Sequence, residues 1–275
     1  MFERLSAHLL EYEAAIRLAA LFALLGVLAG GEELAPRRGL TQSRRQRWLA
    51  NLGLALVDTA LLRLAAPAAA VGLAVTAQNH GWGLLNLLDA PAWAAILLSL
   101  VLLDLALYAQ HLASHKLPVL WRLHRVHHSD LDIDLTTGLR FHPAEILLSM
   151  AYKAAIVVAL GAHPAAVLLY EVLLSSSSLF THSNIRLPER VDRALRRIWV
   201  TPDMHRVHHS VLRNETDSNY SSCLSLWDRV FSTYRAQPQA GHDAMTIGLE
   251  KFRAAADQGL WRMLLQPLQP EHPAR

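Results

Sequence analysis

Residues 90–115 read APAWAAILLSLVLLDLALYAQHLASH. From 90 to 103, continuing past Asp104 to 110, this is an apolar run with one formal charge, and about 20 helical residues cross a bilayer core of roughly 30 Å. Asp104, Tyr108, His111 and His115 follow at spacings of 4, 3 and 4, so they form one stripe on a helix. The stretch therefore predicts a membrane helix whose end brings two imidazoles to the membrane boundary.

Further apolar stretches lie on both sides of this helix. Residues 18–31, extended back to 14, form one, and residues 48–66 form a second. Residues 64–88 carry no formal charge, but Pro67 and three glycines break them, which favours a re-entrant or interfacial segment. Residues 146–184 are long enough for two passes around a turn at 161–164. We expect four to five membrane helices.

The composition agrees with a membrane protein. Of 275 residues, 52% are apolar and 18% charged, whereas a soluble domain carries about 25% charged residues. These values exclude disorder, collagen and coiled coil. The single cysteine excludes an internal disulfide framework, and a net charge of +3 gives no indication of a nucleic-acid partner. The predicted fold class is an all-α integral membrane protein with a histidine-rich helical region that binds two metals.

Arginine distribution predicts the orientation. Five arginines crowd the link between the first two apolar runs, which makes that link cytoplasmic by the positive-inside rule: Arg37, Arg38, Arg44, Arg45 and Arg47. Counting passes forward puts residues 111–142, and everything after His182, on the cytoplasmic side. Acidic residues before the first apolar run argue against a cleaved signal peptide, since that region of a signal peptide is basic.

Ten of the 15 histidines form a series with regular spacing: His111, His115, His124, His127, His128, His142, His182, His205, His208 and His209. The sextet His-Arg-Val-His-His-Ser occurs at 124–129 and again at 205–210. Residues three and four apart share a helical face, so each cluster can direct several imidazoles to one point. The other five, expected at the surface or in turns, are His8, His80, His163, His242 and His272.

This many imidazoles indicate a metal centre. Neutral imidazole suits Fe, Zn, Cu and Ni, and one ion takes about four to six ligands, so eight to ten histidines imply two ions. The His-Glu-x-x-His motif of zinc proteases is absent, as is the Glu-x-x-His pattern of soluble di-iron bundles. A histidine-rich pair of irons that activates O2 beside a membrane fits best. A metal-transporting or metal-sensing membrane protein, with Asp58 and Arg63 on its path, and a zinc hydrolase are the alternatives.

Several motifs between Asp104 and Tyr234 together resemble the fatty acid hydroxylase superfamily, and within it the bacterial sterol desaturase-like branch. They are the 104–115 stripe, Trp121 to Ser129, Leu139 to Glu145 around His142-Pro143, Thr181 to Asn184, Pro202 to Ser210, ETDSNY at 215–220 and WDRVFSTY at 227–234. The chain departs from the pattern of some members at Ser178, where they have a further histidine, and at Ser221 and Ser232, where the family usually has glycine.

The resemblance implies a di-iron centre, with O2 as co-substrate and Zn as a possible substitute in purified samples. It implies nine ligands: His111, His115, His124, His127, His128, His182, His205, His208 and His209. His142 and Asn184 would be residues near the reaction, with Asp217 and Asn219 orienting ligands or water. The implied activity is hydroxylation or desaturation of a sterol, hopanoid, fatty acyl or carotenoid lipid in the bacterial inner membrane. Electrons would come from a separate ferredoxin or cytochrome with its reductase.

Three regions follow from these patterns: membrane helices and the interfacial segment at 1–103, the di-iron region with its membrane hairpin at 104–235, and a tail at 236–275. Residues 188–200 predict an amphipathic helix, either in the lipid headgroup zone or packed on its own domain. Residues 246–265 have helical spacing, and they either cap the site or pack on a partner subunit. The sequence leaves both alternatives open.

Overall fold

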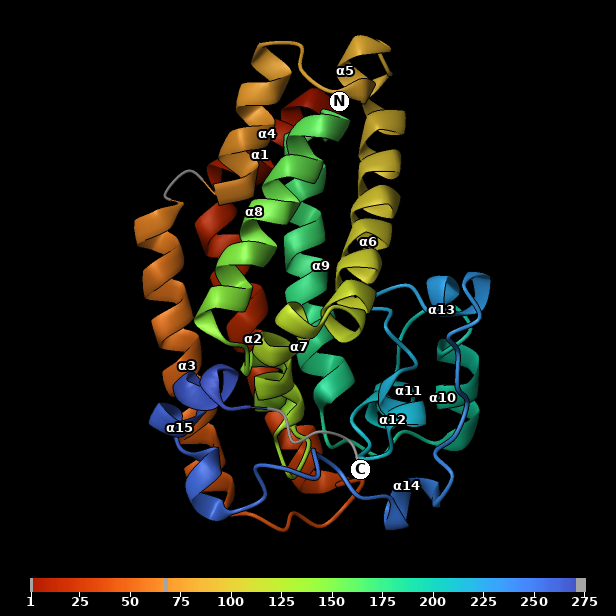
Figure 1. Ribbon diagram of the computed structural model, residues 1–275. Helices are drawn as coiled ribbons and strands as arrows, with labels where there is room; N and C mark the ends of the chain where they lie inside the picture. Colours follow the sequence, from red (N-terminus) through yellow and green to blue (C-terminus); the bar gives the residue numbers. More distant parts are fainter. Residues whose placement is uncertain (1, 67–68, 271–275) are drawn as a thin grey trace.

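The protein is a bundle of long helices above a smaller region of short helices and loops (Figure 1). The computed structural model describes residues 2–66 and 69–270. Within these ranges every regular element is a helix, and β pairing is limited to isolated bridges such as Pro36 with Ile185. The all-α prediction is confirmed.

Five stretches of the described chain are long and apolar enough to cross a membrane, which confirms the upper number expected. They are α2 (Glu13–Leu34), the stretch Arg44–Leu87, α6 (Ala92–Lys116), α8 (Pro143–Leu160) and α9 (Pro164–His182). The outer faces expose large apolar side chains such as Phe22, Leu56 and Leu97. An apolar surface of this extent on helices of this length fits a lipid environment and supports a membrane protein.

The second of these stretches consists of three helices: α3 (Arg44–Ala65), α4 (Ala69–Asn79) and the short α5 (Leu84–Leu87). In Figure 1, α4 continues beyond the end of α3 toward the far end of the bundle, where α5 leads into α6. The segment expected to be re-entrant therefore extends the second crossing. Ala70, Ala74 and Ala77 are fully buried on α4, and small residues like these let helices pack closely. Pro67 lies outside the described residues.

The predicted hairpin at 146–184 is present as α8 and α9. His142 and His163 cap the two helices by accepting from the amides of Ala144 and Ala165. Gly161 ends α8 with a φ of 62°, and a Cβ there would lie 2.6 Å from the Trp82 carbonyl oxygen. Glycine is required at this turn both for its backbone conformation and for the close approach.

The first helix, α1 (Phe2–Glu11), packs on α9 at the far end of the bundle. The smaller region lies toward the end where α2 meets α3 (Figure 1). It contains α7 (Pro118–His128), η1 (Leu135–Leu139), α10 (Glu189–Leu195), α11 (Pro202–His208), α12 (Arg213–Thr216), α13 (Leu226–Val230), α14 (Gly241–Ala244), η2 (Ala255–Gln258), α15 (Leu260–Leu265) and η3 (Gln266–Leu268).

Two predicted helices are shorter than expected. The amphipathic segment at 188–200 is helical only in α10, because the backbone of residues 198–200 bonds to residues 223–225 instead: the Val200 amide donates to the Cys223 carbonyl, and the Ser225 amide donates to the Ile198 carbonyl. In the tail, only η2, α15 and η3 are helical after residue 246. Met263 of α15 is fully buried against α3 and α7, so the tail packs on its own chain beside the histidine-bearing helices.

Candidate metal centre

Both sextets lie at the ends of short helices that begin with proline. Pro118 and Pro202 occupy the first turns of α7 and α11, where the missing amide hydrogen costs nothing. Thr201 caps α11 by accepting from the Met204 amide at 3.3 Å. The histidines of each sextet fall in the last turn and just beyond it, and nearly all of them are buried.

Nine imidazoles gather in two groups. The five-histidine group contains His111, His115, His124, His128 and His208. The four-histidine group contains His127, His182, His205 and His209. Within each group, one ring nitrogen from every residue lies within 4.8 Å of all the others. The structure thus brings together all nine residues that the resemblance implied as ligands.

The two sextets are interleaved between the groups. The first contributes His124 and His128 to the five-histidine group and His127 to the four-histidine group. The second contributes His205 and His209 to the four-histidine group and His208 to the other. In each sextet, the pair four residues apart shares one face, and the histidine between them points to the neighbouring group. Each group therefore takes histidines from both sextets.

The spacing between ring nitrogens fits ligands around an ion. In the five-histidine group, His111 Nε2 lies 3.1 Å from His124 Nε2 and 3.0 Å from His208 Nε2. In the other group, His182 Nε2 lies 3.1 Å from His127 Nε2 and 3.0 Å from His205 Nε2. Two nitrogens bound at about 2.1 Å and separated by a right angle would be about 3.0 Å apart.

The opposite ring nitrogens are mostly held by the protein. The Nδ1 atoms of His111, His182 and His208 lie 2.6–2.7 Å from the carbonyl oxygens of Tyr220, Ser178 and Ser218. His124 Nδ1 lies 2.6 Å from Glu145 Oε1. An Nδ1–H that donates to such an acceptor leaves the Nε2 lone pair free for a metal, and it fixes the orientation of the ring.

Other buried ring nitrogens have no hydrogen-bond partner. These are both nitrogens of His115 and the Nδ1 atoms of His205 and His209. A buried polar atom without a partner costs free energy, and ligation of the Nε2 of His115 would remove one such cost. The donor set is wholly imidazole, which suits Fe or Zn. The residues fit two metal ions, one in each group.

Five histidines of the two groups that lie outside the long helices are held neutral. Burial, and then the surrounding imidazoles, keep the pKa of His127, His128, His205 and His209 well below the ordinary value. Burial lowers the pKa of His208 to about 3, with His124 the next cause. Metal ligation requires the neutral ring, so these histidines need no deprotonation at neutral pH.

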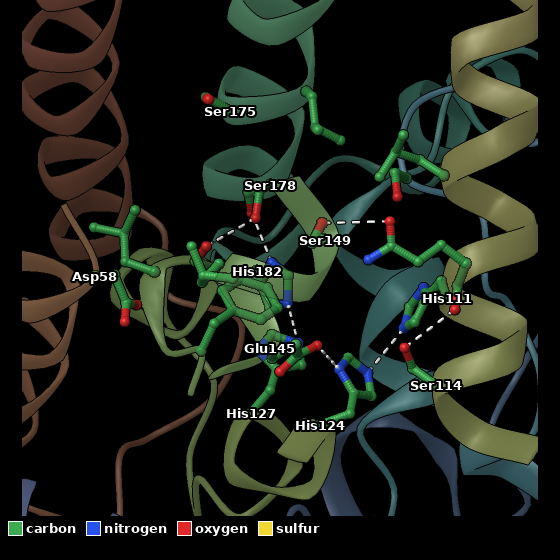
Figure 2. Close-up of a pocket in the computed structure, with 18 of the residues that line it drawn as sticks. Asp58, His111, Ser114, His124, His127, Glu145, Ser149, Ser175, Ser178 and His182 are labelled. Atoms are coloured by element: carbon green, nitrogen blue, oxygen red, sulfur yellow. Dashed lines mark hydrogen bonds and ion pairs between the residues drawn. The ribbon is translucent and has the colours of Figure 1, made fainter. Parts of the chain in front are cut away.

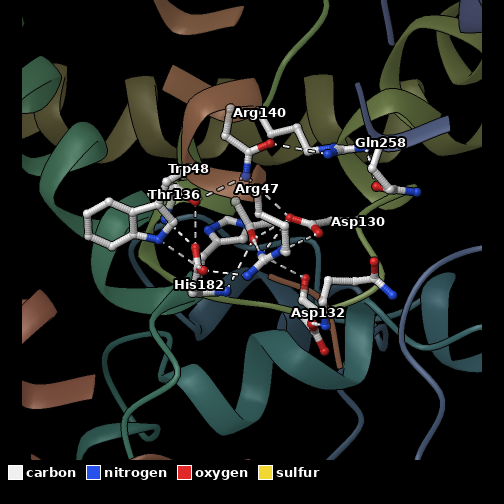
Figure 3. A network of polar contacts seen from close by, with 12 residues as sticks. Arg47, Trp48, Asp130, Asp132, Thr136, Arg140, His182 and Gln258 are labelled. Atoms are coloured by element: carbon white, nitrogen blue, oxygen red, sulfur yellow. Dashed lines mark hydrogen bonds and ion pairs between the residues drawn. The ribbon is translucent and has the colours of Figure 1, made fainter. Parts of the chain in front are cut away.

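A buried polar network lies next to the four-histidine group (Figure 3). Arg47 of α3 donates from Nε and Nη2 to the two carboxylate oxygens of Asp130, at 2.9 and 2.8 Å, and also pairs with Asp134. Burial alone would raise the pKa of Asp130, but Arg47 and Arg140 hold it below its ordinary value. The Arg140 carbonyl lies 3.2 Å from His127 Nδ1, so the network reaches a histidine of the centre.

A cavity of about 370 Å³ lies against the two groups, between α3, α6, α8 and α9 (Figure 2). Five histidines form part of its wall: His111, His124, His127, His182 and His205. Apolar side chains such as Leu62, Leu107 and Ile146 line the rest, with several hydroxyls between them. A metal bound in either group would therefore be next to a largely apolar space inside the membrane bundle.

Other predicted site residues lie outside the two groups. His142 caps α8, and its Nε2 lies 3.2 Å from the Leu264 carbonyl of the tail. Asn184 binds backbone atoms of Arg38 and the side chain of Glu32. Asp104 and Tyr108 hold the 224–233 segment through Trp227 and Thr233.

The remaining predictions have mixed outcomes. Asp217 approaches His115 Nδ1 at 3.6 Å, and Asn219 binds backbone carbonyls. His8 and His80 are exposed, and His163 is in the hairpin turn, as expected. His242 was expected at the surface or in a turn, but it lies in α14 and is buried, because it packs beside Asp203. His272 lies outside the described residues.

Sequence reasoning missed three contributors to this site. It named Glu145 only as the end of a motif resembling the family, it used Arg47 only as a topology signal, and it assigned Asp58 only to a possible transport path. A carboxylate within an apolar run is itself a signal of function, because its burial in lipid is unfavourable. That signal would have identified Asp58, while Glu145, which precedes the 146–184 run, and Arg47 required the fold.

Comparison with known proteins gives an independent assignment. The sequence model of the fatty acid hydroxylase family matches residues 96–233. An ornithine lipid hydroxylase (OlsE) of Rhizobium tropici is 31% identical over 144 residues, covering 52% of this chain and 43% of that protein. Human alkylglycerol monooxygenase is 31% identical over 149 residues, covering 54% and 32%. Rat cholesterol 25-hydroxylase is 28% identical over 147 residues, covering 53% and 48%.

The match spans less than half the length of each of these relatives. No solved structure matches the chain. The matched region contains all nine histidines of the two groups, together with α8, α9 and most of α6. Because the family model covers half of the chain, this protein belongs to the fatty acid hydroxylase family.

Proposed function

We propose that this protein is a membrane-bound, O2-dependent lipid hydroxylase or desaturase with a di-iron centre. The observation that carries the proposal is the pair of all-imidazole groups beside an apolar cavity within the membrane bundle. The named relatives are lipid hydroxylases and monooxygenases, which supports the same class. With iron bound in both groups, the centre would supply the activation of O2 and the oxidation of an unactivated C–H bond.

The chain's own residues would bind the metals and position the substrate. The nine histidines would be the ligands, five for one ion and four for the other. Glu145 and the carbonyls of Tyr220, Ser178 and Ser218 would fix the imidazole rings. The apolar wall would exclude water and hold one carbon of the substrate within about 3–3.5 Å of the reacting group.

The lipid would enter from the bilayer, and electrons would come from a separate ferredoxin or cytochrome with its reductase. The arginine-rich link between α2 and α3 lies at the same end as the two groups (Figure 1). With that link on the cytoplasmic side, the centre would face the cytoplasm of a bacterial cell.

The direct test compares lipid extracts from cells with and without this protein, grown in isotopically labelled O2. We expect a new lipid that carries labelled oxygen if the reaction is hydroxylation, or a new double bond if it is desaturation. The H127A/H208A double variant is the control, since it removes one imidazole from each group. Metal uptake into vesicles without oxygen consumption would contradict the proposal and support a transporter instead.

A further inference from the structure

The cavity wall contains an acidic side chain that the metal centre does not use. Asp58 lies on α3, in the middle of an apolar run, and is 6% exposed. Its Oδ1 atom has no hydrogen-bond partner. Ala55, Asp58, Thr59 and Leu62 all line the cavity, so this face of α3 forms one wall.

A second carboxylate on the same cavity is also only partly satisfied. Glu145 Oε1 is occupied by His124 Nδ1, but Oε2 is buried without a partner. Among the described residues that line the cavity, there is no lysine or arginine. In Figure 2, Asp58 and His111 lie at opposite sides of the view, with His127 and His182 between them.

These features restrict what the cavity can bind. A buried carboxylate oxygen without a partner is unfavourable, and in a membrane helix such a residue indicates a functional site. With no lysine or arginine in the wall to pair with it, an anionic group placed beside Asp58 would be repelled. A hydroxyl or a protonated amine would donate to Asp58 and remove the cost of the unpaired oxygen, while the chain beside it contacts the apolar wall.

We propose that Asp58 binds a hydrogen-bond donor on the lipid substrate, either a hydroxyl or a protonated amine, and so determines which carbon faces the metal centre. The inference rests on the proposed function and adds a substrate class to it: an amphipathic lipid with a donor group at a fixed distance from the oxidised carbon. A lipid whose polar group is only anionic would not bind at Asp58.

Ligand binding without turnover tests this proposal. The probes are hexadecanol, hexadecylamine and hexadecanoate, which share one chain and differ in the polar group. Their binding to the purified, metal-loaded full-length protein in detergent is measured by competition against radiolabelled hexadecanol. Because a hydrogen bond to a charged group contributes about 1.5–3 kcal/mol, we expect the alcohol or the amine to bind about tenfold or more tightly than the carboxylate.

Two variants then assign the effect to Asp58. D58L should lose the preference for alcohol and amine over carboxylate. D58N keeps the size of the side chain but removes its charge. If the natural donor is an amine, amine binding to D58N falls as it does in D58L. If the natural donor is a hydroxyl, D58N largely keeps alcohol binding. T59V is the matched control, because Thr59 also lines the cavity but donates to the Ala55 carbonyl in its own helix. T59V should bind as the wild type.

Metal content and gel-filtration profile show whether each variant is folded, and D58A takes the place of D58L if D58L is not. Equal binding of all three probes to the wild type, or an unchanged preference in the folded D58L or D58A variant, overturns the proposal. The labelled-oxygen experiment is independent: loss of probe preference with retained oxygen incorporation rejects only the role of Asp58. A normal preference without any oxidised lipid rejects only the proposed function.

Discussion

The segments 124–129 and 205–210 have identical sequences but different surroundings. In the first, His124 is held by the Glu145 carboxylate and Arg125 donates to the carbonyls of Gln266 and Gln269 in the tail. In the second, the equivalent His205 has no hydrogen-bond partner on its Nδ1 atom, and Arg206 pairs with Asp203. The shared sextet sets which histidine reaches which group, whereas the rest of the fold decides how firmly each ring is fixed.

The largest effect is expected from His127 and His208, the histidine of each sextet that lies in the group to which the other sextet contributes two histidines. H127A reduces the four-histidine group to three imidazoles, and H208A reduces the five-histidine group to four. We expect both variants to lose activity to background and both to bind less metal, with the larger loss in H127A because fewer ligands remain. Elemental analysis of metal per chain, with helix content by circular dichroism as the folding control, measures this. Full metal content in either variant would refute the ligand assignment.

A smaller effect is expected where the two sextets differ most, at Glu145. E145Q keeps the size of the side chain but removes the charge beside His124 Nδ1, and loss of such a partner reduces metal affinity or activity by about 10–100-fold. Metal affinity by competition with a chelator is the measurement. E250Q, on an exposed side chain, is the matched control and should behave as the wild type. Wild-type affinity in E145Q would show that the carboxylate does not act through His124.

The smallest effect is expected at the serines that end the two sextets. Ser129 Oγ donates to the Val126 carbonyl and accepts from Arg140 at 2.8 Å, whereas Ser210 Oγ accepts from the Leu212 amide at 3.2 Å. S129A leaves a buried guanidinium hydrogen unpaired and should cost about 1–2 kcal/mol of stability, while S210A should cost about 0.5 kcal/mol. Thermal unfolding of the two variants measures the difference. A larger loss in S210A would reverse the comparison.

Much of this arrangement could be predicted from the sequence. The apolar runs predict the membrane helices because a helical segment of that length with almost no charge matches the thickness of a bilayer. The repeated sextet predicts convergence of imidazoles because its spacing matches a helical face. The nine histidines that the resemblance indicated are the nine that the structure gathers into two groups.

Other features depend on long-range contacts that no local pattern contains. The division into five and four, with each sextet serving both groups, arises from how α7 and α11 pack. Arg47 is 83 residues from Asp130 in sequence, so nothing near it indicates a buried ion pair. The helix at 188–200 ends early because residues 198–200 bond through their backbone to residues 223–225, which the apolar periodicity does not reveal.

The interleaving of the sextets has a consequence for biosynthesis. The histidines come from α6 and α9 of the bundle and from α7, α11 and the residue after α11 in the smaller region, so bound ions would cross-link the two regions. Ligand binding to the folded state alone stabilises that state by mass action. In a chain made during metal starvation, the C-terminal third would lack these cross-links and would be cleaved more readily by proteases. We therefore expect the cellular amount of this protein to rise and fall with the iron supply.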